Sequence, residues 1–216
     1  MNKPLMRITL ILMIFIIGLN SAELEIAVIE KSKGMAFKLF EEQREILKRG
    51  DIIKQSENIQ TGSGAYTKIR FIDNDGFIFI GGESDAILSL FLSDENSEKV
   101  FSLKKGIIYA STKNFSRIET QGAVILFDSS EVYVESSEDT LKVFCISGNA
   151  RIESAWGEAF LKANEEAVLL DELTPYKTNK PEKRITLIEL ESQPDLIEVE
   201  LENSKMEKRN IILEVE

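Results

Sequence analysis

Short apolar runs separated by turn residues constrain the fold of this chain more than any other feature of its sequence. Between residues 23 and 174, runs rich in Val, Ile and Phe recur about every eight to twelve positions. This spacing is typical of antiparallel sandwiches and barrels. The runs are Tyr66–Ile72, Phe77–Ile80, Ile107–Ser111, Val132–Glu135, Leu141–Ile146 and Ala150–Glu153. We therefore predict an all-β domain, an antiparallel β-sandwich or jelly-roll-like fold, over residues 23–174.

Two turn sequences are predicted to form hairpins between these runs. The first is Asp73–Gly76, with the sequence Asp-Asn-Asp-Gly, and the second is Ser147–Asn149, with the sequence Ser-Gly-Asn. Both contain residues that tolerate the positive φ angles of a tight turn. The segment Phe37–Leu47 fits a helical period about as well as a strand, turn and strand, and we favour the strands.

Glycine and proline usage divides the chain near Thr174. None of the 12 glycines follows Gly157, whereas three of the four prolines do. Beyond this point the runs 184–191, 196–201 and 210–215 alternate apolar with acidic residues. We expect residues 175–216 to form an acidic, strand-rich C-terminal extension of the main domain.

The first 22 residues have the pattern of a secretory signal peptide. Lys3 and Arg7 supply positive charge, the uncharged apolar run Ile8–Leu19 follows, and Ala22 is the expected cleavage position. The run is shorter than the roughly 20 apolar residues of a membrane-spanning helix. We therefore favour a cleaved peptide over a retained anchor. This predicts a periplasmic or extracellular protein with no stable membrane span after cleavage.

Charge and residue usage exclude several classes of function. The chain has 37 acidic and 26 basic side chains, a net charge of -11, no histidine and one cysteine. This composition excludes a disulfide framework, a His-based catalytic triad and a Cys/His zinc site. Nucleic acid is an unsuitable partner because no basic stripe is present to bind phosphates. We expect a protein that is not an enzyme and that binds no metal or cofactor.

Several acidic residues and the cysteine are candidate chemical sites. Asp73 and Asp75, with Glu83 and Asp85 nearby, suggest a calcium loop, but a strand follows directly and a hairpin turn is favoured. The acidic residues show no distinctive spacing for a carboxylate-dependent glycan hydrolase. Cys145 lies in an apolar run and has no histidine to activate it, so we expect a buried structural thiol.

Trp156 is the candidate binding residue. It lies beside Gly157 at an expected turn, where a tryptophan can be an exposed contact for a protein or a sugar. The alternative is a side chain folded back over the end of the core. The sequence leaves both interpretations open.

Short motifs follow one another in a fixed order between Ile26 and Leu170. They place Gly50 and Asp51 in Leu-x-x-Gly-Asp-x-Ile, Thr61 and Gly62 in Ile-x-Thr-Gly, Asp75 and Gly76 in an Asp-Gly turn, Ser84 in Gly-x-x-Ser, Gly106 in Leu-x-x-Gly, and Gly148 between two late apolar runs. In their order and spacing these motifs resemble the FecR protein domain family. Where that family commonly has a Gly-Thr turn, this chain has Ser129 and Ser130.

The resemblance implies an all-β fold, structural turns at the motif residues and a non-catalytic, extracytoplasmic role. Gly62 is expected to adopt a backbone conformation closed to other residues. Typical family members place an anti-sigma segment and a membrane helix ahead of this domain, whereas a signal pattern precedes it here. We therefore expect a binding module that recognises an envelope protein or a glycan. The alternative is a sensor subunit of a trans-envelope sigma/anti-sigma system whose anti-sigma partner is a separate chain.

Overall fold

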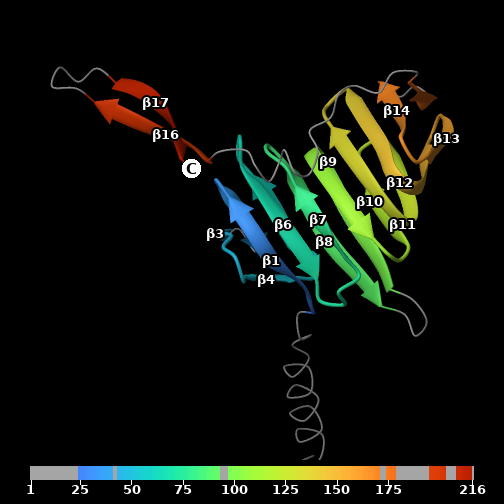
Figure 1. Ribbon diagram of the computed structural model, residues 1–216, viewed down its shortest axis with the longest axis horizontal. Helices are drawn as coiled ribbons and strands as arrows, with labels where there is room; N and C mark the ends of the chain where they lie inside the picture. Colours follow the sequence, from blue (N-terminus) through green and yellow to red (C-terminus); the bar gives the residue numbers. More distant parts are fainter. Residues whose placement is uncertain are drawn as a thin grey trace, which may run out of the picture.

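The structure is a computed structural model that describes residues 24–40, 43–92, 97–170, 174–178, 195–202 and 208–215. Every regular element in these residues is a β-strand (Figure 1), which confirms the all-β fold class. The expected signal segment, residues 1–22, and the expected run 184–191 lie outside the described residues.

Within the described residues, fifteen strands form one continuous hydrogen-bonded sheet. They are β1 (Glu25–Lys33), β2 (Ala36–Phe40), β3 (Gln43–Ile46), β4 (Ile52–Lys54), β5 (Asn58–Thr61), β6 (Tyr66–Phe71), β7 (Gly76–Ile80), β8 (Asp85–Leu92), β9 (Ser97–Thr112), β10 (Ser116–Glu119), β11 (Ala123–Ser136), β12 (Thr140–Ser154), β13 (Gly157–Lys162), β14 (Glu165–Leu170) and β15 (Tyr176–Lys177). A separate two-stranded sheet contains β16 (Asp195–Glu202) and β17 (Lys208–Val215), drawn in red in Figure 1.

The three longest strands, β9, β11 and β12, change partners halfway along their length. The first part of β9 pairs with β8 and β10, and the second part pairs with β7 and β11. β12 likewise pairs first with β14 and then with β13. The sheet is thereby folded into two layers, ordered β4-β1-β6-β7-β9-β11-β12-β14-β15 and β3-β2-β5-β8-β9-β10-β11-β12-β13. The sandwich is therefore continuous through its bent strands.

The core lies between the two layers. One cluster of buried residues includes Ile69 and Phe71 from the first layer and Leu88 and Phe101 from the second. The rings of Phe71 and Phe101 are 5.7 Å apart. The pairings are antiparallel except for β9 with β10, which is parallel and departs from the purely antiparallel expectation. This pair is parallel because β10 returns beside β9 after the chain has crossed to the other layer.

Glycines allow the long strands to bend. Gly106 has φ +100 and Gly148 has φ +79, in the left-handed region that other residues rarely adopt. At each bend a serine hydroxyl takes the space of a side chain: a Cβ on Gly106 would lie 2.2 Å from Oγ of Ser84, and one on Gly148 would lie 2.2 Å from Oγ of Ser130. Both serines accept a hydrogen bond from a backbone N–H of the bent strand.

The predicted hairpin at Ser147–Asn149 is wrong, because β12 continues through these residues from Thr140 to Ser154. Ser130 Oγ accepts the Asn149 N–H at 3.0 Å and donates to the Asp128 carbonyl at 2.7 Å, replacing ladder bonds at the bend. β11 bends at the same place, where its register with β12 shifts. The positive φ of Gly148 thus turns a corner between layers instead of reversing the chain.

Other turns were predicted correctly. Asp73–Gly76 joins β6 and β7 as a hairpin, and Phe37–Leu47 forms strands β2 and β3. The expectation for Gly62 is wrong, because its φ is not positive; Gly64, with φ +66, occupies the strained position of that turn. Gly62 instead uses its backbone, donating to the Met35 carbonyl and accepting from the N–H groups of Ala65 and Glu83.

The main sheet continues a few residues past Thr174, where the domain was expected to end. β15 pairs with β14 through Lys177 and Tyr176, and Thr178 donates its N–H to the Glu166 carbonyl. Two of the three runs predicted in the C-terminal extension form strands, β16 and β17, which pair with each other along their whole length.

Candidate binding groove

The carboxylates that suggested a calcium loop hold a lysine instead. The side chain of Lys99 is fully buried, and its Nζ lies 2.8 Å from Oδ2 of Asp73 and 2.8 Å from Oδ2 of Asp75. The ammonium also lies 5.2 Å from the centre of the Phe71 ring, a cation–π distance. Lys99 belongs to β9 and the aspartates to the β6–β7 turn, so this cluster joins the two layers internally.

Cys145 is buried in β12, as its apolar surroundings predicted. Burial raises the pKa of its thiol to about 11, and the negative charge of Glu165 adds to the effect. A raised thiol pKa lowers the concentration of the reactive thiolate at neutral pH. We therefore assign this residue a packing role.

This assignment predicts slow thiol chemistry. At pH 8, folded protein should react with a disulfide reagent such as DTNB about 100-fold or more slowly than protein unfolded in guanidinium, because both the raised pKa and burial protect Cys145. The rate of thionitrobenzoate release measures this difference. Equal rates in the folded and unfolded protein would show that Cys145 is accessible and reactive.

An open groove of about 700 Å³ lies where the second layer meets the end of the first. It is lined by Phe115, Leu126, Phe127, Asp128, Asn149, Ala150, Arg151, Phe160, Leu161, Lys162 and Lys177. These residues come from β11, β12, β13 and β15 and from the position just before β10. The groove therefore depends on strand pairing between segments far apart in the sequence.

Two exposed aromatic rings and a guanidinium dominate the groove surface. Phe160 is 57% exposed and Phe115 is 44% exposed. The register places Arg151 opposite Phe160 on one side and opposite Leu126 on the other. Its guanidinium carbon lies 5.3 Å from the centre of the Phe160 ring. An aromatic ring beside a cation is a surface that binds apolar and acidic side chains.

Ion pairs hold the groove cations in place. Nη2 of Arg151 lies 2.7 Å from Oε2 of Glu158 and 3.0 Å from Oε1 of Glu153, and the hydrogen bond to Glu158 raises the pKa of Arg151. Nζ of Lys177 lies 2.6 Å from Oε2 of Glu165, whose pKa it lowers. The positive charge of Lys162 also helps to lower the pKa of Glu165, so all three cations of the groove act on neighbouring carboxylates.

Trp156 lies at the surface but outside this groove. Its side chain is 55% exposed in the turn between β12 and β13, which favours the partner-contact interpretation over a core position. Thr174 donates a hydrogen bond of 2.9 Å to its carbonyl oxygen. Sequence reasoning missed Phe160, four residues further on, although the alternation from Glu158 to Lys162 already puts it on the polar side of that strand.

The predicted turn residues have structural roles. Asp51 accepts the Lys48 N–H at 2.7 Å in the turn that contains Gly50, which has φ +91. Thr61 donates its hydroxyl to the Gly81 carbonyl, and Gly76, with φ +119, packs against the backbone of β9. None of these residues lines the groove; only the bend at Gly148 adjoins it, through Asn149.

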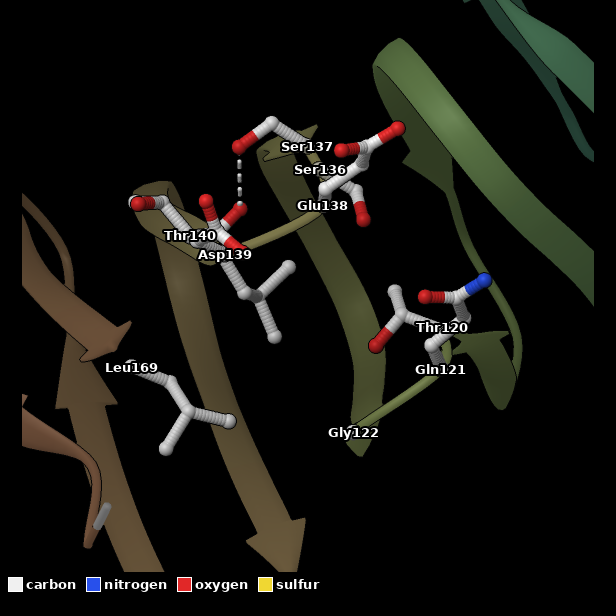
Figure 2. Close-up of a pocket in the computed structure, with 10 residues that line it drawn as sticks. Thr120, Gln121, Gly122, Ser136, Ser137, Glu138, Asp139, Thr140 and Leu169 are labelled. Atoms are coloured by element: carbon white, nitrogen blue, oxygen red, sulfur yellow. Dashed lines mark hydrogen bonds between the residues drawn. The ribbon is translucent and has the colours of Figure 1, made fainter. Parts of the chain in front are cut away.

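A smaller cavity of about 280 Å³ lies between the turns that flank β11. Figure 2 shows Thr120, Gln121 and Gly122 at the lower right, the turn from Ser136 to Thr140 above them, and Leu169 at the left. Several of its hydroxyls are used within their own turns: Ser137 Oγ donates to the Thr140 carbonyl at 3.2 Å, and Thr120 Oγ1 donates to the Ala123 carbonyl at 3.0 Å. We therefore favour the larger groove, with its exposed rings, as the binding site.

Among the described residues, no group of three or more Cys, Asp or Glu side chains is placed to hold a metal ion. That part of the chain also contains no helix long and apolar enough to cross a membrane.

Comparison with known proteins gives a likeness of fold. No family model matches the chain, and no curated protein matches it. Two crystal structures described as a "putative anti-sigma factor" from Parabacteroides distasonis ATCC 8503, at 1.65 Å and 2.50 Å resolution, are similar to it. Their TM-scores are 0.51 and 0.50, each with 13% sequence identity. Each match covers 57% of this chain and 59% of the other, so the shared fold spans little more than half of either protein.

Proposed function

We propose that this chain is a non-catalytic, FecR-like binding module that works in the periplasm or outside the cell and recognises a protein partner. The observation that carries the proposal is the groove, in which exposed Phe160 and Phe115 lie beside Arg151 and Lys162. Exposed aromatic rings with adjacent cations are typical of the few residues that supply most of an interface's binding energy. A protein suits this surface because its apolar side chains can cover the two exposed rings.

A second candidate is a sensor subunit of a trans-envelope signalling system, with the sigma-binding segment on a separate chain. The similarity to crystal structures described as an anti-sigma factor favours this role. Under this candidate the groove receives a component of the same signalling system. A neighbouring gene for a sigma factor or an outer-membrane receptor would support it.

The test measures binding after partner capture. The tagged chain is used to isolate an envelope protein from the organism that encodes it, and the affinity of the purified pair is then measured by calorimetry. Phe160→Ser should weaken binding by about 10- to 100-fold, because it removes the exposed ring that a partner would cover. Folding should be unaffected, because that ring is 57% exposed.

The matched control is Phe91→Ser. Phe91 lies on β8, outside the groove, and is 52% exposed, so the two substitutions remove the same side chain from similar surroundings. The control should bind as the unaltered chain does. Equal affinities for both variants would contradict the groove as the binding surface.

A further inference from the structure

The buried cluster of Lys99, Asp73 and Asp75 has the residue types and contacts that amide formation requires. The Lys99 side chain is fully buried, and its Nζ lies 2.8 Å from Oδ2 of each aspartate. A lysine amine becomes a nucleophile when its ammonium gives up a proton, and a carboxylate in hydrogen-bond contact can take that proton. The fold thus brings a nucleophile, an acyl group and a proton carrier together in one place.

The two aspartates differ in their contacts and in their burial. Oδ1 of Asp73 accepts the backbone N–H of Asp75 at 2.9 Å, while Oδ2 of Asp73 contacts the ammonium. A backbone donor at one carboxyl oxygen stabilises the negative charge that develops there when the carbon is attacked. The Asp73 side chain is 25% exposed and that of Asp75 is 10% exposed. Asp73 therefore suits the role of the acyl group, and the more buried Asp75 suits the role of the proton carrier.

The surroundings of the cluster favour condensation. The hairpin between β6 and β7 fixes the two aspartates, and the Phe71 ring lies 5.2 Å from the ammonium. Groups held in contact in this way can react as if one were present at an effective concentration of about 10⁵ M. Exclusion of bulk water opposes the reverse reaction, hydrolysis. A lysine and an aspartate that do not condense when free in water can therefore do so here.

We propose that Lys99 and Asp73 join through an amide bond in the folded chain. Asp75 takes a proton from the ammonium, and the resulting amine attacks Cγ of Asp73. Two of the three ammonium protons pass through Asp75 to Oδ2, the bond between Cγ and Oδ2 breaks, and one water molecule leaves. The nitrogen keeps its third proton and donates it to Asp75. The step needs no oxidant or reductant, and the chain reacts once with itself.

The bond links the two layers of the sandwich. Asp73 lies in the turn between β6 and β7 of the first layer, and Lys99 lies in the part of β9 that pairs with β8 and β10. The two residues are 26 positions apart in the chain. A chain with a single cysteine cannot form an internal disulfide, and this amide restrains the unfolded chain in the same way. The inference is independent of the groove and of the proposed function.

Mass spectrometry of the purified full chain tests the bond. The denatured chain should weigh less than its sequence by one water molecule. Cleavage after glutamate cuts the chain between the two residues, and peptides 58–83 and 99–119 should then appear as one linked species. Lys99→Met and Asp75→Ala should each give the two peptides separately and at full mass, because the first variant lacks the nucleophile and the second lacks the proton carrier.

The matched control is Lys104→Met on the same strand. Lys104 is 58% exposed and its Nζ lies 3.8 Å from Asp85, so this variant should form the linked species as the unaltered chain does. Circular dichroism shows whether each variant folds, and the result for the unaltered chain depends on no variant. Separate peptides at full mass from the unaltered chain would overturn the proposal. A loss of water confined to peptide 58–83 would also overturn it, because an aspartate would then have closed onto its own backbone.

Discussion

Replacement of Lys99 by methionine is expected to lower the free energy of unfolding by about 3–5 kcal/mol. The methionine fills a similar volume, but it leaves the carboxylates of Asp73 and Asp75 without the ammonium that lies 2.8 Å from each. Asp75 is itself buried, so its charge then lacks both water and a counter-ion. Urea denaturation followed by circular dichroism measures the change.

The control for this prediction is Lys104→Met on the same strand. Lys104 is 58% exposed and its Nζ lies 3.8 Å from Oδ1 of Asp85, so its loss should cost about 1 kcal/mol or less. Adding Asp73→Asn and Asp75→Asn to the Lys99→Met chain should recover part of the lost stability, because the buried negative charge is removed. Equal losses for Lys99→Met and Lys104→Met would refute the role of the buried cluster.

Gly106→Ala is expected to cost about 3 kcal/mol or more, from two additive causes. The residue has φ +100, which strains any residue with a side chain. The new Cβ would also lie 2.2 Å from Oγ and 2.4 Å from Cα of Ser84, so backbone must move. The bend that carries β9 from one layer to the other would be distorted, and thermal unfolding should show it.

Substitutions at two other glycines distinguish the backbone strain of a positive φ from the steric clash of an added Cβ. Gly50 has φ +91 but nothing within 4 Å of an added Cβ, so Gly50→Ala should cost only the strain, about 1 kcal/mol. Gly122 has neither a positive φ nor a close backbone contact, and its substitution by alanine should be nearly neutral. A Gly106→Ala chain as stable as Gly122→Ala would show that the bend does not require glycine.

Local sequence chemistry predicted the strands and the hairpin at Asp73–Gly76, because alternation and turn residues act over a few positions. The hairpin prediction at Gly148 was wrong because a residue with positive φ can occur in a chain reversal or in the bend of a continuous strand. The choice is made by Ser130, eighteen residues earlier, whose hydroxyl replaces the ladder bonds of the bend. No short-range pattern contains that contact.

The site was less predictable than the fold. The sequence left the exposure of Trp156 open, and the structure shows it exposed. The groove requires Arg151 opposite Phe160, which the β12–β13 register provides. The sequence correctly indicated that the carboxylates of Asp73 and Asp75 lie near a cation. That cation is the Lys99 ammonium and not calcium. Lys99, distant in sequence and placed in an apolar layer, could not be paired with them before the fold was known.

Site-specific photo-crosslinking in living cells tests the central claim most directly. A benzophenone amino acid is placed at position 160 in the groove, or at position 91 on β8 as a control of similar exposure. The account predicts that irradiation joins one defined envelope protein to the chain from position 160 and not from position 91. Crosslinking to the same protein from position 91 but not from position 160 would contradict the groove as the site of recognition.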